Sequence, residues 1–182
     1  MKLKEFKIIK VCKICKSNNL KLIFRNNPSP IGEEFLNIDK KKKKQKKYPI
    51  DYMCCQNCGL LQIKHFVNSE LVYPDYLYET KTSPTLNSYF EKSSNKLKKK
   101  LKLNSHSSIL EIGSNDGTLL KKFKKTTQQL IGIEPSKHIS KKANNDGIYT
   151  INQFLNKNSV NVALKKNKNK FDLVIATNVI AN

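Results

Sequence analysis

Four of the five cysteines stand in two pairs, each pair with two residues between its members. Cys12 and Cys15 form the first pair, Cys55 and Cys58 form the second, and 39 residues lie between the pairs. Each pair can place two thiolates on one tetrahedral ion, so two pairs complete a closed metal site. We therefore predict a structural zinc site, because four cysteine ligands leave no coordination position open for chemistry.

Three alternatives concern these residues. The fifth cysteine, Cys54, could compete as a ligand, but with two intact pairs present we expect it to be a small buried residue. A redox-active pair would lie beside a thioredoxin-like strand–helix unit, and neither pair does. His65 could replace one cysteine, although a single histidine at a strand end is more often an ordinary surface residue.

A second group of residues has the types that hold a nucleotide-like ligand. Residues 110–117, Leu-Glu-Ile-Gly-Ser-Asn-Asp-Gly, follow the pattern of a strand, a glycine turn and the start of a helix. Gly113 and Gly117 let the chain turn sharply and let a ligand approach the backbone, where the helix N-terminus presents free N–H groups. Glu134 lies 21 residues after Gly113, at the end of the next expected strand. An acidic side chain at that place accepts hydrogen bonds from ribose hydroxyls.

The loop does not fit a dinucleotide. That fingerprint needs glycine at positions 113, 115 and 118, where this chain has Gly113, Asn115 and Thr118. A site for S-adenosylmethionine (AdoMet) needs less room, and it fits the pattern of an acidic residue, Glu111, followed by the two glycines. We predict the front half of an AdoMet site over residues 109–134, with Asp116 as a turn and N-cap residue. The alternative is a strand–turn–helix unit without a ligand.

Three unlike segments must position these residues. Residues 1–68 form the expected zinc domain, with short strands at 7–9, 20–24 and 60–63 and a solvated, lysine-rich loop at 40–47. Residues 69–104 form a bridge, in which an aromatic-rich stretch precedes an amphipathic helix over 85–103; we expect this helix to pack on a neighbouring domain rather than lie on a membrane. Residues 105–182 alternate strands and helices, which predicts an α/β fold with a doubly wound, Rossmann-like parallel sheet. Its expected strands are 108–113, 130–133, 149–151 and 171–176, and its expected helices include 118–125 and 136–144.

The net charge of +21 suggests a polyanionic partner, but the kind of basic residue argues against one. Only Arg25 supplies the planar fork that phosphate and base recognition favours, and the other basic residues are lysines. We therefore expect a solvated lysine surface and no nucleic-acid partner, with a zinc-knuckle nucleic-acid-binding module as the alternative function. No apolar run has the ~18 residues of a membrane span, and the N-terminus lacks a signal-peptide core. These features predict a cytoplasmic chain with reduced thiols and no membrane partner.

Taken together, the motifs resemble the zinc-containing, AdoMet-dependent C-methyltransferases of deoxysugar biosynthesis. The resemblance covers essentially the whole chain: a four-cysteine domain, a tyrosine-containing bridge and the glycine loop. Further matching stretches are Tyr48-Pro49-Ile50-Asp51, Cys58-Gly59-Leu60-Leu61-Gln62, Gly132-Ile133-Glu134-Pro135-Ser136 and Asn178-Val179-Ile180-Ala181-Asn182.

The resemblance implies methyl transfer from AdoMet to a carbon of a nucleotide-linked keto-deoxysugar. An acidic C–H next to the ketone would lose its proton, and the enolate would attack the methyl group. Tyr76 and Tyr78 are the candidate contacts to the sugar nucleotide, with hydrophobic packing between the domains as the alternative. The candidate cofactor-binding residues are Glu111, Gly113, Ser114, Asn115, Gly117, Glu134 and Asn178.

Two departures from the family modify this expectation. Family members are considerably longer and carry a further C-terminal α/β domain, with the His, Glu and Tyr residues expected to do acid–base work. Many members also have histidine where this chain has Asn182, and a neutral amide cannot act as a base. We therefore assign no catalytic base and expect an N-terminal fragment that is inactive alone, for which a separate C-terminal polypeptide is a candidate partner. A degenerate remnant that binds nothing is a third interpretation.

Overall fold

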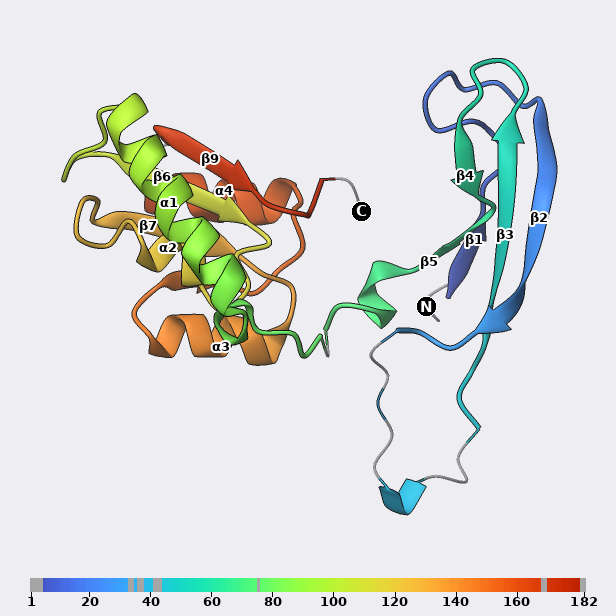
Figure 1. Ribbon diagram of the computed structural model, residues 1–182, viewed down its shortest axis with the longest axis horizontal. Helices are drawn as coiled ribbons and strands as arrows, with labels where there is room; N and C mark the ends of the chain where they lie inside the picture. Colours follow the sequence, from blue (N-terminus) through green and yellow to red (C-terminus); the bar gives the residue numbers. More distant parts are fainter. Residues whose placement is uncertain are drawn as a thin grey trace. The chain divides into compact units, whose positions relative to one another are not determined.

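A computed structural model of the chain describes residues 5–32, 35, 38–40, 44–74, 76–167 and 170–180. The chain divides into two compact units, Met1–Tyr73 and Pro74–Asn182 (Figure 1). The first unit carries all the cysteines, and the second carries the glycine loop. Among the described residues, no helix has both the length and the apolar character needed to cross a bilayer.

The first unit is built from antiparallel strands. One sheet has three strands in the order β2-β3-β4, and β1 pairs with β5 in a separate two-stranded ribbon. The long hairpin of β2 and β3 is its most extended feature in Figure 1. The elements are β1 (Phe6–Ile8), β2 (Leu20–Ser29), the 3-10 helix η1 (Ile38–Lys40), β3 (Tyr48–Cys55), β4 (Leu61–Ile63), β5 (His65–Val67) and the 3-10 helix η2 (Ser69–Leu71).

The strand β3 was not foreseen from the sequence, and β2 is longer than predicted. Pro49 lacks a backbone N–H and aspartate is a poor strand former, so residues 48–55 do not read as a strand. The structure accommodates Pro49 because that end of β3 pairs only with β2, while β4 pairs with Tyr52, Met53 and Cys54. The β2–β3 register runs from Leu20 opposite Cys55 to Ser29 opposite Tyr48, with two irregularities.

The second unit confirms the predicted α/β fold. Its four strands are all parallel and lie in the order β8-β7-β6-β9. The strands are β6 (Ser108–Ile112), β7 (Gln129–Ile133), β8 (Tyr149–Ile151) and β9 (Leu173–Ala176). The helices are η3 (Thr80–Thr82), α1 (Pro84–Lys100), α2 (Thr118–Lys121), α3 (Lys137–Asn145) and α4 (Lys157–Lys166).

Two apolar clusters form the core of this unit. Successive residues of a strand point to opposite faces of the sheet, so Ile109 joins one cluster and Leu110 the other. The first cluster contains Phe90, Ile109, Leu119, Leu120, Phe123, Leu130, Ala143 and Ile148. The second contains Leu110, Ile131, Ile133, Ile151 and Ala163. The strands β6 and β7 are buried at almost every position, which explains why they are rich in apolar residues, whereas in β9 the Val174 side chain is 54% exposed.

The helix α1 belongs to this second unit and packs against its core. The Ser83 side chain caps its start by accepting a hydrogen bond from the Leu86 backbone N–H at 3.3 Å, and Pro84 occupies the first turn. Phe90 is buried in the first cluster, and three lysines end the helix, where cations favour its dipole. The apolar stripe of this helix is thus used for packing within the second unit.

The strand order sets the place where a ligand site is expected. The chain moves outward from β6 to β7 and β8, then returns through α4 to place β9 on the other side of β6. In open parallel sheets, ligands bind beyond the carboxyl ends of the strands at such a reversal. The glycine loop begins at the carboxyl end of β6, at this reversal point.

Candidate functional site

The structure brings the four paired cysteines together within the first unit. Their four sulfur atoms all lie within 4.8 Å of one another. The sulfurs of Cys12 and Cys58 are 3.6 Å apart, and those of Cys15 and Cys55 are 3.5 Å apart. Each pair therefore faces the other across a space of the size that four thiolates make around one tetrahedral ion.

The two cysteine pairs have the same local backbone shape. The residue after the second cysteine of each pair has a left-handed conformation, Lys16 with φ 63° and Gly59 with φ 74°. The backbone N–H of each donates to the carbonyl of the first cysteine of its own pair, at 3.1 Å for Lys16 and 2.9 Å for Gly59. The sequence Cys-x-x-Cys thus folds twice into one type of tight turn, which points both sulfurs to the same side.

The four thiols differ in acidity because they share one small space. Burial raises the pKa of Cys12. The N–H groups of Cys15 and Ile14 and the Cys58 thiol lower it by more than burial raises it, so the resulting pKa is about 6. The Leu60 N–H lowers the pKa of Cys58, but the neighbouring Cys12 and Cys15 raise it more, to about 12. One thiolate therefore hinders the ionisation of the next, and a divalent cation among the sulfurs would remove that repulsion.

Cys54 and His65 lie outside the cluster. Cys54 is half-buried, and its S–H faces the carbonyls of Cys55 and Gly59 at 3.7 and 3.8 Å. His65 is half-buried in β5, with its ring edge-on to Phe6 at 5.8 Å between centroids. The described residues that meet the geometry of a metal site are the two cysteine pairs alone.

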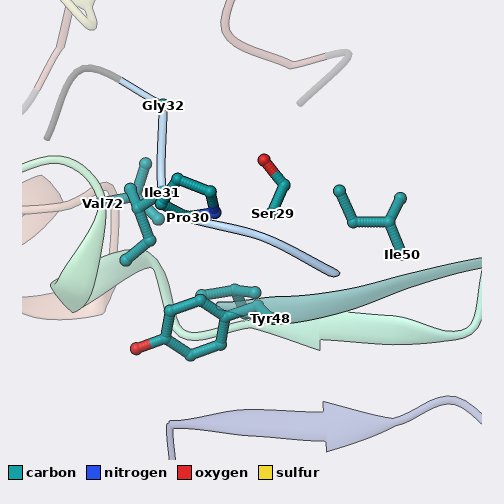
Figure 2. Close-up of a pocket in the computed structure, with 8 residues that line it drawn as sticks. Ser29, Pro30, Ile31, Gly32, Tyr48, Ile50 and Val72 are labelled. Atoms are coloured by element: carbon teal, nitrogen blue, oxygen red, sulfur yellow. The ribbon is translucent and has the colours of Figure 1, made fainter. Parts of the chain in front are cut away.

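An apolar hollow of about 200 Å³ lies elsewhere in the first unit (Figure 2). Pro30, Tyr48, Ile50 and Val72 contribute to its lining, which includes no charged residue. A surface of this kind offers packing rather than acid–base or metal chemistry. We assign it no catalytic role.

In the second unit, the glycine loop is tied to the end of the neighbouring strand. The backbone N–H groups of Gly113 and Ser114 both donate to the carbonyl of Ile133, at 2.8 and 3.1 Å. Gly113, Asn115 and Gly117 have left-handed φ values of 64°, 50° and 72°. These conformations suit glycine and asparagine, so the sequence of the loop is matched to its turn.

Glu134 lies next to this loop, at the carboxyl end of β7. One carboxylate oxygen accepts a hydrogen bond from the Asn115 N–H at 3.0 Å, and the other accepts one from the Ser136 N–H at 2.8 Å. Burial raises the pKa of Glu134, and the N–H groups of Ser136 and Asn115 oppose this shift. A carboxylate has about four acceptor positions, so two remain for hydroxyl groups of a ligand.

Two buried polar atoms beside the loop have no hydrogen-bond partner among the described residues, Oε2 of Glu111 and Oγ of Ser114. Burial, followed by the charges of Asp116 and Glu134, raises the pKa of Glu111 well above its ordinary value. Buried polar groups are normally hydrogen-bonded, so unpartnered ones are unusual. Both side chains are only 3% exposed, and the Ser114 hydroxyl lies against Gly132 of β7. Glu134 is the residue whose place fits a ligand with ribose hydroxyls, as AdoMet has.

Asp116 caps the helix differently from the prediction. Its Oδ1 accepts hydrogen bonds from the backbone N–H and the hydroxyl of Thr118, at 3.1 and 2.6 Å. The N-cap position itself is Gly117, which makes no side-chain cap. The second oxygen, Oδ2, accepts from the backbone N–H of Lys81 at 3.0 Å. The same aspartate therefore caps α2 and holds a segment that precedes α1.

Residues 76–82, which we call the strap, run beside the glycine loop. The predicted substrate contacts Tyr76 and Tyr78 belong to it, with ring centroids 6.4 Å apart in an edge-on arrangement. Tyr78 is 40% exposed. The hydrogen bonds between strap and loop were not predicted from the sequence, because nothing in the local pattern of residues 76–82 indicates which side chains they meet.

The structure describes residues 178–180 of the last stretch that matches the family, Asn178–Asn182. Asn178 follows β9 with a left-handed φ of 56°, and Val179 lies against the α-carbon of Gly113. Asn182, where many family members have histidine, lies outside the described residues. The structure thus brings Glu111, Gly113, Ser114, Asn115, Gly117 and Glu134 to one edge of the sheet.

Comparisons with known proteins bear on the cysteine cluster and on the family resemblance. Residues 12–73 match a family described as "Putative zinc binding domain". The chain is also 20% identical over 140 residues to the C-methyltransferase NovU of Streptomyces niveus, a match that covers 77% of this chain. The chain spans about a third of the length of that relative, 33%. The two matches support the resemblance to zinc-containing C-methyltransferases and a zinc-binding role for the four cysteines.

Proposed function

We propose that this chain, which is similar to the zinc-containing C-methyltransferases, carries the AdoMet-binding part of an enzyme. That enzyme methylates a carbon of a nucleotide-linked keto-deoxysugar. One observation supports this proposal more strongly than any other. The glycine loop, Glu134 and two unpartnered buried polar atoms meet at the reversal point of a parallel sheet, in a chain that also holds a four-cysteine cluster. Neither feature alone would distinguish a sugar C-methyltransferase from other methyltransferases.

In this proposal the residues have distinct tasks. Cys12, Cys15, Cys55 and Cys58 hold a structural zinc ion that fixes the fold of the first unit. Glu134 accepts the ribose hydroxyls, and the loop between Gly113 and Gly117 lets the cofactor approach the backbone. Tyr76 and Tyr78 face the sugar nucleotide. When bound, AdoMet supplies an electrophilic methyl group for transfer to the carbon next to the ketone.

The test is AdoMet binding by isothermal titration calorimetry. Glu134→Gln replaces the ribose acceptor by a neutral amide of the same shape, so we expect at least a tenfold weaker dissociation constant. Asp172→Asn is the matched control: the Asp172 carboxylate also accepts hydrogen bonds from a backbone N–H and a hydroxyl, both of Ser108, but at the opposite edge of the sheet. This control should bind AdoMet within twofold of wild type.

Two results would reject the proposal. One is the absence of saturable AdoMet binding, including no rise of the melting midpoint with AdoMet, because a ligand specific to the folded state must raise it. The other is tight nucleic-acid binding whose affinity falls steeply with salt, which would favour the binding-module alternative. Gly113→Arg should also abolish AdoMet binding; because it crowds Val179, its fold is checked by circular dichroism.

A further inference from the structure

The strap is held to the glycine loop by side chains of the loop rather than by its own. Its backbone supplies the carbonyl of Tyr78 and the N–H groups of Thr80 and Lys81. The partners on the loop are the carboxamide of Asn115 and the carboxylate of Asp116. Because these bonds use the backbone of the strap, its side chains take no part in them.

Asn115 makes the larger share of these bonds. Its Oδ1 accepts from the Thr80 N–H at 2.9 Å, and its Nδ2 donates to the Tyr78 carbonyl at 2.9 Å. The same Oδ1 also accepts from the Asp116 N–H at 2.9 Å. An aspartate could replace the two acceptor bonds but not the donor bond, and glycine could adopt the left-handed φ but make none of the three.

Asn115 also contacts the other side of the site. Its backbone N–H is the donor to Oε2 of Glu134, the candidate ribose acceptor. The strap and this carboxylate are therefore joined by a single residue, with the strap on its side chain and the carboxylate on its backbone. Two hydrogen bonds of the Asn115 side chain thus connect Tyr78 and Thr80 to the residue that contacts Glu134.

The rest of the strap is anchored to α3 and to the turn before it. Glu79 forms an ion pair with Lys142 of α3 at 2.5 Å and a second one with Lys81 of the strap at 3.1 Å. These contacts lower the pKa of Glu79. The Ser136 hydroxyl donates to the Tyr76 carbonyl at 3.2 Å. Glu79 and the Tyr76 carbonyl thus tie the strap to α3 and to the turn before it, whereas Asn115 and Asp116 tie it to the cofactor loop.

We propose that Asn115 is a positioning residue that fastens the strap to the cofactor loop, so that binding at the loop also fixes the strap that presents Tyr76 and Tyr78 to the sugar nucleotide. This inference rests on the proposed function for the identity of the cofactor. It assigns to Asn115 a task beyond contact with AdoMet, and it predicts that the cofactor orders the substrate-facing segment.

The test follows the backbone amides of Thr80 and Lys81 by hydrogen exchange in the ¹⁵N-labelled full chain, with and without AdoMet. In Asn115→Gly the Thr80 amide should exchange at least tenfold faster, while Lys81 changes less because Asp116 still accepts its bond. In Asn115→Asp the Thr80 amide should stay near the wild-type rate, since the acceptor oxygen remains. Asn152→Ala is the matched control, because the Asn152 amide donates to the carbonyls of Glu134 and Pro135, which lie outside the strap.

Saturating AdoMet should slow exchange across the strap in wild type and in the control, and it should fail to do so in Asn115→Gly even when that variant binds AdoMet. The inference is overturned if Thr80 exchange in Asn115→Gly stays within twofold of wild type, or if AdoMet protects the strap equally in that variant. Failure of wild type to bind AdoMet would reject the proposed function and the coupling to the cofactor. Exchange at Thr80 without ligand would still decide whether Asn115 fastens the strap.

Discussion

A Cβ atom on Gly113 would overlap the side chain of Val179, a residue 66 positions later in the chain. Gly113 also has a left-handed φ of 64°. Two independent causes therefore require glycine here, a backbone conformation and a close contact. The contact joins the loop after β6 to the segment after β9, the two sides of the reversal point.

The first prediction separates those two causes by a double-mutant cycle. Gly113→Ala should lower the free energy of unfolding by the left-handed penalty, roughly 1–2 kcal/mol, plus a further amount for the overlap. In a Val179→Ala background the overlapping methyl is gone, so the cost should fall toward the left-handed penalty alone. The free energy of unfolding is measured by denaturant for wild type, the two single variants and the double variant. Gly59→Ala is the control, since Gly59 has φ 74° with no atom near its Cβ position. Equal costs of Gly113→Ala in both backgrounds would contradict the contact.

The second prediction concerns metal content. The purified chain should release one zinc ion per molecule when its thiols are blocked, as measured with a colorimetric chelator. Cys55→Ser should abolish this release and lower the melting midpoint, because a structural zinc ion contributes directly to folding. Cys54→Ser is the matched neighbour, since Cys54 lies outside the cluster, and it should keep the full zinc content. Loss of zinc in Cys54→Ser with retention in Cys55→Ser would reverse the assignment.

The third prediction follows from the raised pKa of Glu111, which burial causes first and the charges of Asp116 and Glu134 reinforce. The folded chain holds the proton of the Glu111 carboxyl more tightly than the unfolded chain, in which a glutamate has a pKa of about 4.3. The contribution of Glu111 to the free energy of unfolding should therefore fall as pH rises above that value, by about 1.4 kcal/mol per pH unit until its folded pKa is passed.

Glu111→Gln has no proton to lose, so it should become more stable than wild type as pH rises from ~4.3 to 8. Urea unfolding across that range measures the difference between the two chains. The exposed Glu70→Gln serves as control and should follow wild type throughout. A constant difference between wild type and Glu111→Gln at all pH values would show that Glu111 does not titrate as a buried acid.

Much of the second unit could be predicted because its signals are local. The run from Ser108 to Gly113 is mostly apolar and ends in glycine, and Glu134 follows the next apolar run at the expected distance. Parallel strands buried on both faces have this composition, so the strand positions followed from the pattern, whereas the order of the strands in the sheet was not predicted. The cysteine pairs are equally local, because each pair forms within one tight turn.

What could not be predicted depends on contacts between distant residues. The bonds of Asn115 to Tyr78 and Thr80 span more than 30 positions, and no periodicity marks them. The strand β3 was missed because its pairing with β2, rather than its own composition, makes residues 48–55 extended. Glu79 and Lys142 each read as surface charges, and only the packing of the strap beside α3 makes them a pair.

The strand order has a consequence for how the second unit is made. β6 is synthesised first among the four strands, yet it lies between β7 and β9, and its Ile109 is paired with Leu173. During translation, one edge of this apolar strand must remain without its neighbour until residues 173–176 have left the ribosome. Such long-range parallel pairing is intrinsically slow to form. The nascent chain therefore passes through a stage in which β6 is exposed along one side, and this stage is the one at which chaperone binding or aggregation would compete with folding.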